Sequence, residues 1–268
     1  MDRRTIVILP GDGIGNIVMD QALRVLDAAG FDASYVFGDI GWEFWRSEGN
    51  PLPQRTLDLI REHRIALFGA ITSKPNEEAK AELDPGLQGK GFVYSSPIVG
   101  LRQKFNLDIC VRPCRSYRGN PLNFIRRGKE GSIEEPYIDA VIFRQNTECL
   151  YSGVEWTNPP EKVYDALMTH PKFRENFSSV PGEELSVSVR IFTKKATARI
   201  LKAAFDYARD NGYKSVTVCE KPNVVRETSG MMWKLAKEIQ KDLYPGIKLV
   251  NTNIDAQKIG RASCRERV

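Results

Sequence analysis

Three arginines, a tyrosine and a lysine are the residues of this chain whose types and order point to chemistry. Arg102, Arg112 and Arg144 are followed by Tyr151 and, far downstream, by Lys221. Guanidinium groups keep their charge and can form two parallel hydrogen bonds to a carboxylate, so three of them can hold a substrate with several carboxylates. Tyrosine and lysine can move protons where burial or neighbouring charge brings their pKa toward neutrality. The sequence therefore predicts an enzyme for a small polyanionic acid.

Alternating strand and helix patterns fill the first hundred residues, and these elements must position the residues that act there. Strands are expected at residues 5–9, 33–37 and 65–70, with helices after the first two, the second of them at 53–63. A β–α–β–α–β order of this kind predicts a parallel sheet that is covered by helices.

The first expected helix carries an apolar stripe that should pack on this sheet, with Gly30 as its C-terminal stop. The turn before it, Gly11-Asp12-Gly13-Ile14-Gly15, resembles a dinucleotide-binding loop. Asn16, however, stands where that fingerprint has its third glycine, so we interpret the segment as a structural strand-to-helix turn. The residues expected on the stripe are Val18, Ala22, Val25, Leu26 and Ala29.

After about residue 107 the pattern changes, and a second domain is expected at 108–257, next to a first one at 1–107. Residues 118–136 are rich in glycine, proline and charge. They predict either an arm that reaches a partner or a plain surface loop. Strands are expected at 107–112, 138–144, 185–192, 215–219 and 247–251, and helices at 193–210 and 227–241.

Composition and charge narrow the class of protein. Of the 268 residues, 41% are apolar and 27% charged, which is ordinary for a globular protein. No stretch is long enough to span a bilayer and no signal peptide is visible, so we expect no membrane contact and a cytoplasmic location. The net charge is +5, but residues 258–268 carry +3 of it and interrupt the preceding pattern, so we interpret them as a non-native tail. The remaining +2 gives no basis for nucleic-acid binding.

Five short segments, taken in order, resemble the β-decarboxylating dehydrogenases, the family of isocitrate, homoisocitrate, 3-isopropylmalate and tartrate dehydrogenases. The resemblance runs from about residue 5 to 257. It implies an α/β fold with a parallel-sheet large domain, incomplete in this chain, and a smaller α/β domain with a dimerisation arm. The segments are Leu9–Gly15, Gly100–Arg102, Val111–Pro113, Arg144–Gly153 with Asn146, Thr147 and Glu148, and Lys221–Asn223.

The resemblance also implies a reaction. A nicotinamide cofactor, NAD or NADP, takes hydride from the carbinol carbon of a 2-hydroxy acid. The β-keto acid then loses CO2 with help from Mg2+ or Mn2+, and the enol is protonated. By matching position, Tyr151 would be the acid and Lys221 the base. The substrate would bind Ser96, Arg102, Arg112, Arg144 and Asn223, the cofactor Thr72 and Asn223, and the metal Asp255.

Taken singly, these residues also have ordinary interpretations. Arg102 or Arg144 alone is more often a surface ion pair, and Tyr151 a core residue whose hydroxyl has a partner. Asp255 alone is more often a cap at a strand end. Their shared order favours the functional interpretation.

The substrate loop leaves alternatives open. Ser96 stands where isocitrate enzymes place a serine for the extra carboxylate, whereas Ile98 stands where many of them have asparagine. The sequence Ser-Ser-Pro-Ile-Val also resembles homoisocitrate dehydrogenases, and an apolar pocket for 3-isopropylmalate fits the serine pair poorly. We favour isocitrate, a tricarboxylic acid, over homoisocitrate.

In the family, the lysine and first metal aspartate belong to the neighbouring subunit, so a homodimer with shared active sites is expected. The chain stops before the family's further metal aspartates and its adenosine-binding loop, so we expect an incomplete and inactive fragment of an enzyme. A noncatalytic regulatory subunit is the alternative from another class. Retention of both Tyr151 and Lys221 argues against it, because binding alone needs neither group.

Overall fold

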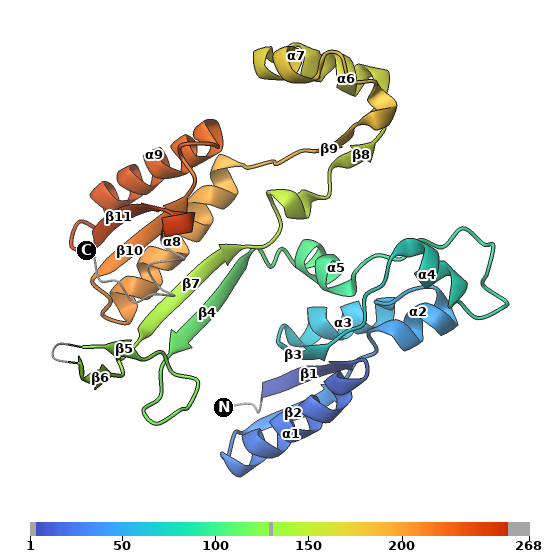
Figure 1. Ribbon diagram of the computed structural model, residues 1–268. Coiled ribbons are helices and arrows are strands. Elements are labelled where there is room, and N and C mark those ends of the chain that lie inside the picture. Colours follow the sequence, from blue (N-terminus) through green and yellow to red (C-terminus); the bar gives the residue numbers. More distant parts are fainter. Residues whose placement is uncertain (1–3, 129–130, 257–268) are drawn as a thin grey trace. The chain divides into compact units, whose positions relative to one another are not determined.

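The computed structural model describes residues 4–128 and 131–256 (Figure 1). The chain divides into two compact units, of which unit 1 ends at Phe105 and unit 2 begins at Asn106. In the part of the chain that is described, no helix is both long and apolar enough to cross a membrane. The segment 258–268, interpreted above as a non-native tail, lies outside the described residues.

Unit 1 is built on a three-stranded parallel sheet. Its strands are β1 (Arg4–Gly11), β2 (Ala33–Phe37) and β3 (Ala66–Ala70), in the order β2-β1-β3. The registers pair Ile6 with Tyr35 and Ile8 with Leu67. The parallel sheet expected from the β–α–β–α–β pattern is confirmed.

Helices cover both faces of this sheet, because successive side chains of a strand point to opposite sides. Ile6 and Ile8 pack with Met19 of α1 (Ile14–Ala28). The alternate residues Val7 and Leu9 pack with α3 (Gln54–His63) through Leu57 and Ile60. Burial on both sides explains why the first strand is an unbroken apolar run rather than an alternating one.

The stripe predicted on α1 is partly wrong. Val18 and Val25 are 46% and 67% exposed, whereas Gly15 and Met19 are buried. Gly15 decides this rotation, because a Cβ built there would lie 2.3 Å from the carbonyl oxygen of Pro10. The residue with no side chain therefore faces the sheet, and the two valines lie to one side of the line through Gly15 and Met19.

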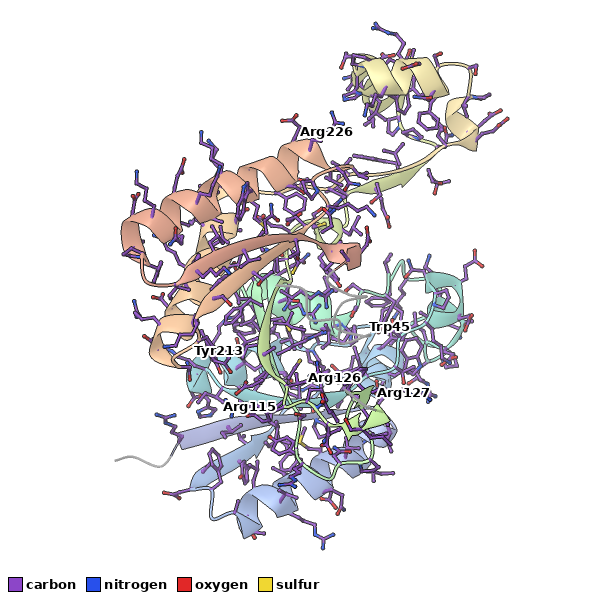
Figure 2. All side chains as sticks on the ribbon, turned by 60° about the vertical axis from the view of Figure 1, so that its left-hand side comes forward. Trp45, Arg115, Arg126, Arg127, Tyr213 and Arg226 are labelled. Carbon is purple, nitrogen blue, oxygen red and sulfur yellow. The ribbon has the colours of Figure 1, made fainter. Side chains whose placement is uncertain are left out.

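Three short helices of unit 1 were not expected. They are α2 (Trp42–Glu48), α4 (Asn76–Ala81) and α5 (Pro97–Lys104). Short helices show too few turns for a clear periodicity, and their stability comes from packing. Trp45, labelled in Figure 2, is fully buried and packs with Tyr94 and Ala79 in a cluster that fixes α2 and α4.

Unit 2 contains a parallel strand pair with a crossover helix. Its elements are α8 (Lys194–Asp210), β10 (Ser215–Glu220), α9 (Arg226–Leu243) and β11 (Lys248–Asn253). The two strands pair in parallel, and the core between strands and helices is centred on Phe205, Val218 and Ala236. These elements lie where the sequence predicts them.

An antiparallel ribbon joins this core. It consists of β4 (Ile109–Arg115) and β7 (Asp139–Gln145), and β7 contacts α8 through Phe143 and Tyr207, whose rings are 5.6 Å apart. The segment 118–136, expected to be a loop or an arm, contains in its described residues the short hairpin of β5 (Arg126–Arg127) and β6 (Ile133–Glu134).

A second excursion of unit 2 carries its own helices (Figure 1). Here β8 (Glu155–Thr157) pairs with β9 (Ser186–Ser188), and between them lie α6 (Glu161–Met168), α7 (Pro171–Phe177) and the turn η3 (Gly182–Glu184). The strand expected at 185–192 is thus only three residues long. Its partner β8 also has only three residues, so the ladder between them is short. Beyond it, Ile191 forms an isolated bridge with Cys149.

Candidate active site

Register places two of the predicted arginines on one face of the β4–β7 ribbon. Arg144 lies opposite Cys110, and Arg112 follows Cys110 by two residues on the same strand. Residues opposite each other in an antiparallel pair share a face, as do alternate residues along a strand. The other face carries Phe143, which packs against Tyr207 of α8. The two guanidinium groups therefore belong to the face turned away from this helix.

Tyr151 lies against one of these arginines. It belongs to the 3-10 turn η2 (Leu150–Ser152), and the guanidinium carbon of Arg144 is 4.8 Å from the centre of its ring. A guanidinium over an aromatic face is attracted by the negative potential of the ring. Tyr151 is 36% exposed. The structure thus brings the predicted acid and one predicted carboxylate-binding group together.

The loop between Arg144 and Tyr151 is fixed by two polar side chains. The Gln145 Oε1 atom accepts hydrogen bonds from the backbone N–H groups of Thr147 and Glu148, at 2.7 and 2.8 Å. The Glu148 carboxylate accepts from the backbone N–H and hydroxyl of Thr193, at 2.9 and 2.6 Å. Thr193 caps the N-terminus of α8. No role was predicted for Gln145 or Glu148, because a motif does not show which of its polar residues bind the backbone.

Lys221 and Asp255 form a second pair in unit 2. Both follow the carboxyl ends of parallel strands, β10 and β11, which meet at one edge of a sheet. The Lys221 Nζ atom donates to a carboxylate oxygen of Asp255. The predicted base and the predicted metal ligand therefore share one ion pair. Asn223 is exposed in the turn that follows β10.

The residues available for a metal are few. Asp255 supplies a hard oxygen donor of the kind that Mg2+ and Mn2+ prefer. In residues 4–128 and 131–256, however, no group of three or more histidine, cysteine or carboxylate side chains comes together. The described residues do not form a metal site by themselves.

The remaining predicted residues, Thr72, Ser96 and Arg102, belong to unit 1. Ser96 precedes the first residue of α5 and makes no side-chain capping hydrogen bond, and Arg102 lies in the last turn of that helix. A pocket of about 160 Å³ includes Ser96 and Lys104 in its lining. Thr72 lies in the loop after β3, where its backbone N–H donates to Asp12.

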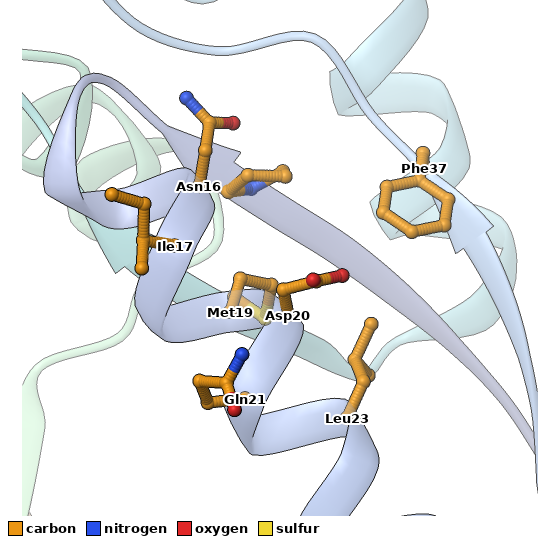
Figure 3. A pocket seen from close by; sticks show the side chains of 8 residues that line it. Asn16, Ile17, Met19, Asp20, Gln21, Leu23 and Phe37 are labelled. Carbon is orange, nitrogen blue, oxygen red and sulfur yellow. The ribbon is translucent and has the colours of Figure 1, made fainter.

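A larger groove of unit 1 has the wrong chemistry for the expected substrate. It measures about 460 Å³ and is lined by residues of α1, by Pro10 and by Phe37 (Figure 3). Its only charged group is the carboxylate of Asp20, which would repel a polycarboxylic acid. No predicted site residue lines it.

The sequence matches the family described as isocitrate/isopropylmalate dehydrogenase, over residues 5–259. The chain belongs to this family. Among its relatives, it is 36% identical to the protein DlpA of Legionella pneumophila over 253 residues, which are 94% of this chain and 38% of that protein. It is 32% identical to homoisocitrate dehydrogenase of Methanocaldococcus jannaschii, with 88% of this chain and 57% of that enzyme covered.

A solved family member confirms the fold. The isocitrate dehydrogenase of Methylococcus capsulatus superposes with a TM-score of 0.73 at 30% identity, and 97% of this chain and 63% of that one are covered. Isocitrate dehydrogenase [NADP] of Archaeoglobus fulgidus is 31% identical, over 91% of this chain and 54% of that enzyme. The α/β fold and the family resemblance are therefore both confirmed. The chain spans less than two thirds of the length of these relatives.

Proposed function

We propose that the chain contributes the substrate-binding and proton-transfer groups of an enzyme that oxidatively decarboxylates isocitrate. The observation that carries the proposal is the placement of Arg112 and Arg144 on one ribbon face, with Tyr151 against Arg144. Two permanent cations suit a substrate with several carboxylates, and a phenol beside them suits proton transfer. Family membership supports the same chemistry.

Lys221 would take the proton of the substrate hydroxyl as the carbinol carbon is oxidised, and a nicotinamide, when bound, would supply the hydride acceptor. The β-keto acid would then lose CO2, and the electron pair of the broken C–C bond would form an enolate. Tyr151 would donate a proton to the enolate carbon, which gives the 2-oxo acid. Arg112 and Arg144 hold carboxylates throughout.

Isocitrate is preferred over the alternatives because of Ser96. The third carboxylate of isocitrate needs a polar partner in the protein. In 3-isopropylmalate an apolar isopropyl group stands where isocitrate carries this carboxylate. Ser96 is half-buried at the start of α5 and its hydroxyl makes no capping bond. Homoisocitrate is the second candidate, since relatives of both names match the chain. NAD or NADP, and Mg2+ or Mn2+, are expected from the family.

The test measures binding and turnover of the three acids with each cofactor, in Mg2+ and in Mn2+. We expect isocitrate to bind most tightly, and Arg144→Met to weaken its binding by about tenfold or more, because a charge-assisted contact is lost. Arg144→Lys, which keeps the charge but not the forked geometry, should lose less. Unchanged affinity for isocitrate in Arg144→Met would contradict the proposal. Tight binding with no turnover, in a full-length enzyme as well, would instead favour a noncatalytic regulatory subunit.

We further propose a cytoplasmic homodimer whose active sites are shared between subunits. Mixing two variants of a full-length enzyme that are each inactive alone, Lys221→Met and Tyr151→Phe, tests this, because a mixed dimer would contain one site with both groups intact. Recovered turnover is the expected result. No recovery in a mixture shown to exchange subunits would place both groups in the same chain's site.

A further inference from the structure

The turn between β1 and α1 carries a carboxylate that ties two distant loops together. The Asp12 Oδ1 atom accepts from the backbone N–H of Trp42 at 2.6 Å, and its Oδ2 atom accepts from the backbone N–H of Thr72 at 2.8 Å. These partners are 30 and 60 residues away in the chain. A strand-to-helix turn requires neither hydrogen bond. The Asp12 side chain therefore stabilises the positions of the two loops rather than the turn to which it belongs.

Glycines allow these loops to approach so closely. Gly11 has a φ of +81°, and a Cβ there would lie 1.9 Å from the carbonyl oxygen of Ala70. Gly41 has a φ of +118°, and its Cβ would lie 2.4 Å from Asp12 Oδ1. Side chains at either position would push the backbone away from its partner. Gly11, one of the glycines that resemble a nucleotide-binding fingerprint, thus has a second explanation, because together with Gly41 it lets the neighbouring segments close around Asp12.

Thr72 is held from its other side as well. Its carbonyl oxygen accepts the hydroxyl of Tyr94 at 3.0 Å. Tyr94 is only 8% exposed, and its ring lies 5.1 Å from Trp42 and 5.3 Å from Trp45. Both backbone groups of Thr72 are therefore bound to anchored side chains.

The Thr72 side chain remains available. In the described part of the chain its hydroxyl makes no hydrogen bond, and the residue is only half-buried. A hydroxyl can donate and accept, which suits the carboxamide or a ribose hydroxyl of a nicotinamide nucleotide. A fixed backbone with an unused hydroxyl is the arrangement expected of a pre-positioned ligand contact.

We propose that Asp12 is a positioning residue, which fixes the backbone of Thr72 so that the Thr72 hydroxyl is oriented for the nicotinamide cofactor. This inference rests on the proposed function, in which Thr72 contacts that cofactor. Asp12→Asn is the informative change. Asparagine has the same size but one acceptor oxygen, and its NH2 group would face a backbone N–H, so one of the two bonds must be lost.

The first experiment measures amide hydrogen exchange in the whole chain. In Asp12→Asn we expect the amide hydrogen of Thr72 or of Trp42 to exchange with solvent about tenfold faster, because the hydrogen bond that protects this amide is lost. The amide of Ile8, in the centre of the sheet, should exchange as in the wild type. Unchanged exchange at both loop amides, or equal acceleration at all three, would overturn the positioning role.

The second experiment separates this inference from the proposed function, by titrating NADH and NADPH into a full-length enzyme and its Asp12→Asn, Thr72→Val and double variants. We expect each single variant to bind about two- to tenfold more weakly, the effect of one hydrogen bond, and the double variant to bind no more weakly than Thr72→Val. Additive losses would overturn the positioning role alone. No loss in Thr72→Val, or no binding by the wild type, would overturn the cofactor assignment of the proposed function. The exchange measurement would then still decide whether Asp12 fixes Thr72.

Discussion

Unit 1 and unit 2 hold their candidate functional residues in different ways. In unit 1, Thr72 is fixed through its backbone, by hydrogen bonds to Asp12 and to the buried Tyr94. In unit 2, Lys221 and Asp255 hold each other by side chains that are 39% and 60% exposed. Water screens exposed ion pairs, so they contribute little to stability and a ligand can replace them. The comparison shows a loop shaped before a ligand arrives and a charged pair that a ligand can rearrange.

The largest expected effects come from the two cores, and they test the domain division we propose near residue 107. Trp45→Ala in unit 1 and Phe205→Ala in unit 2 each remove a fully buried ring. Each should lower the free energy of unfolding of its own unit by about 3–5 kcal/mol. Hydrogen exchange resolved along the chain is the measurement. Phe177→Ala, at a 46% exposed ring, is the control. Equal destabilisation of both units by either core variant would contradict the division.

Arg199→Met should have the next largest effect. The Asp108 side chain is 7% exposed; its Oδ2 atom accepts a hydrogen bond from Arg199 Nε at 2.7 Å and forms an ion pair with Arg199 Nη2 at 2.6 Å. Removing the cation leaves a buried carboxylate without its partner, and should cost unit 2 about 2 kcal/mol in chemical denaturation. Arg209→Met is the matched control, because its partners Asp206 and Asp210 are exposed. A cost for the control as large as that for Arg199→Met would refute the burial argument.

Lys221→Met should separate function from stability. The exposed pair with Asp255 should contribute about 0–1 kcal/mol to unfolding, and less at high salt. Turnover by a full-length enzyme should nevertheless be lost, since the proposed base is gone. Denaturation at low and high salt, together with the rate of NADH or NADPH formation, measures both. If Lys221→Met lowered the free energy of unfolding as much as Arg199→Met does, the Lys221–Asp255 pair would not be the weak, rearrangeable pair that distinguishes unit 2 from unit 1.

The smallest effect is a pH dependence of unit 2 at Asp139. Hydrogen bonds from Tyr213 and Arg115, both labelled in Figure 2, lower the pKa of the Asp139 carboxyl below its usual value. The stabilisation is therefore present above the usual aspartate pKa of about 3.9 and is lost as the pH falls through the lowered value. Acid unfolding curves should show Tyr213→Phe less stable than the wild type at neutral pH, with the gap closing in acid. A gap that stays constant into acid would exclude this linkage.

Much of the fold could be predicted from local patterns. The apolar run of β1 and the later alternation of strands and helices indicated the parallel sheet and its order of elements. The rotation of α1 could not be predicted, because Val18 and Val25 continue an apolar stripe and only the close approach of Gly15 to Pro10 shows which side faces the sheet. The helix α2 was missed because it has only seven residues and depends on the aromatic cluster around Trp45.

By itself the sequence determined which chemical groups are available, the three arginines, the tyrosine and the lysine, and the order of elements that carries them. Only the tertiary structure decided which of these groups meet. Lys221 pairs with Asp255 across 34 residues, and Asp12 reaches Thr72 across 60. Arg112 and Arg144 share a face because of the register of two strands. The spacing of apolar residues in a sequence indicates which side chains of one helix or strand share a face. Contacts between residues far apart in the chain depend instead on the path of the backbone between those residues.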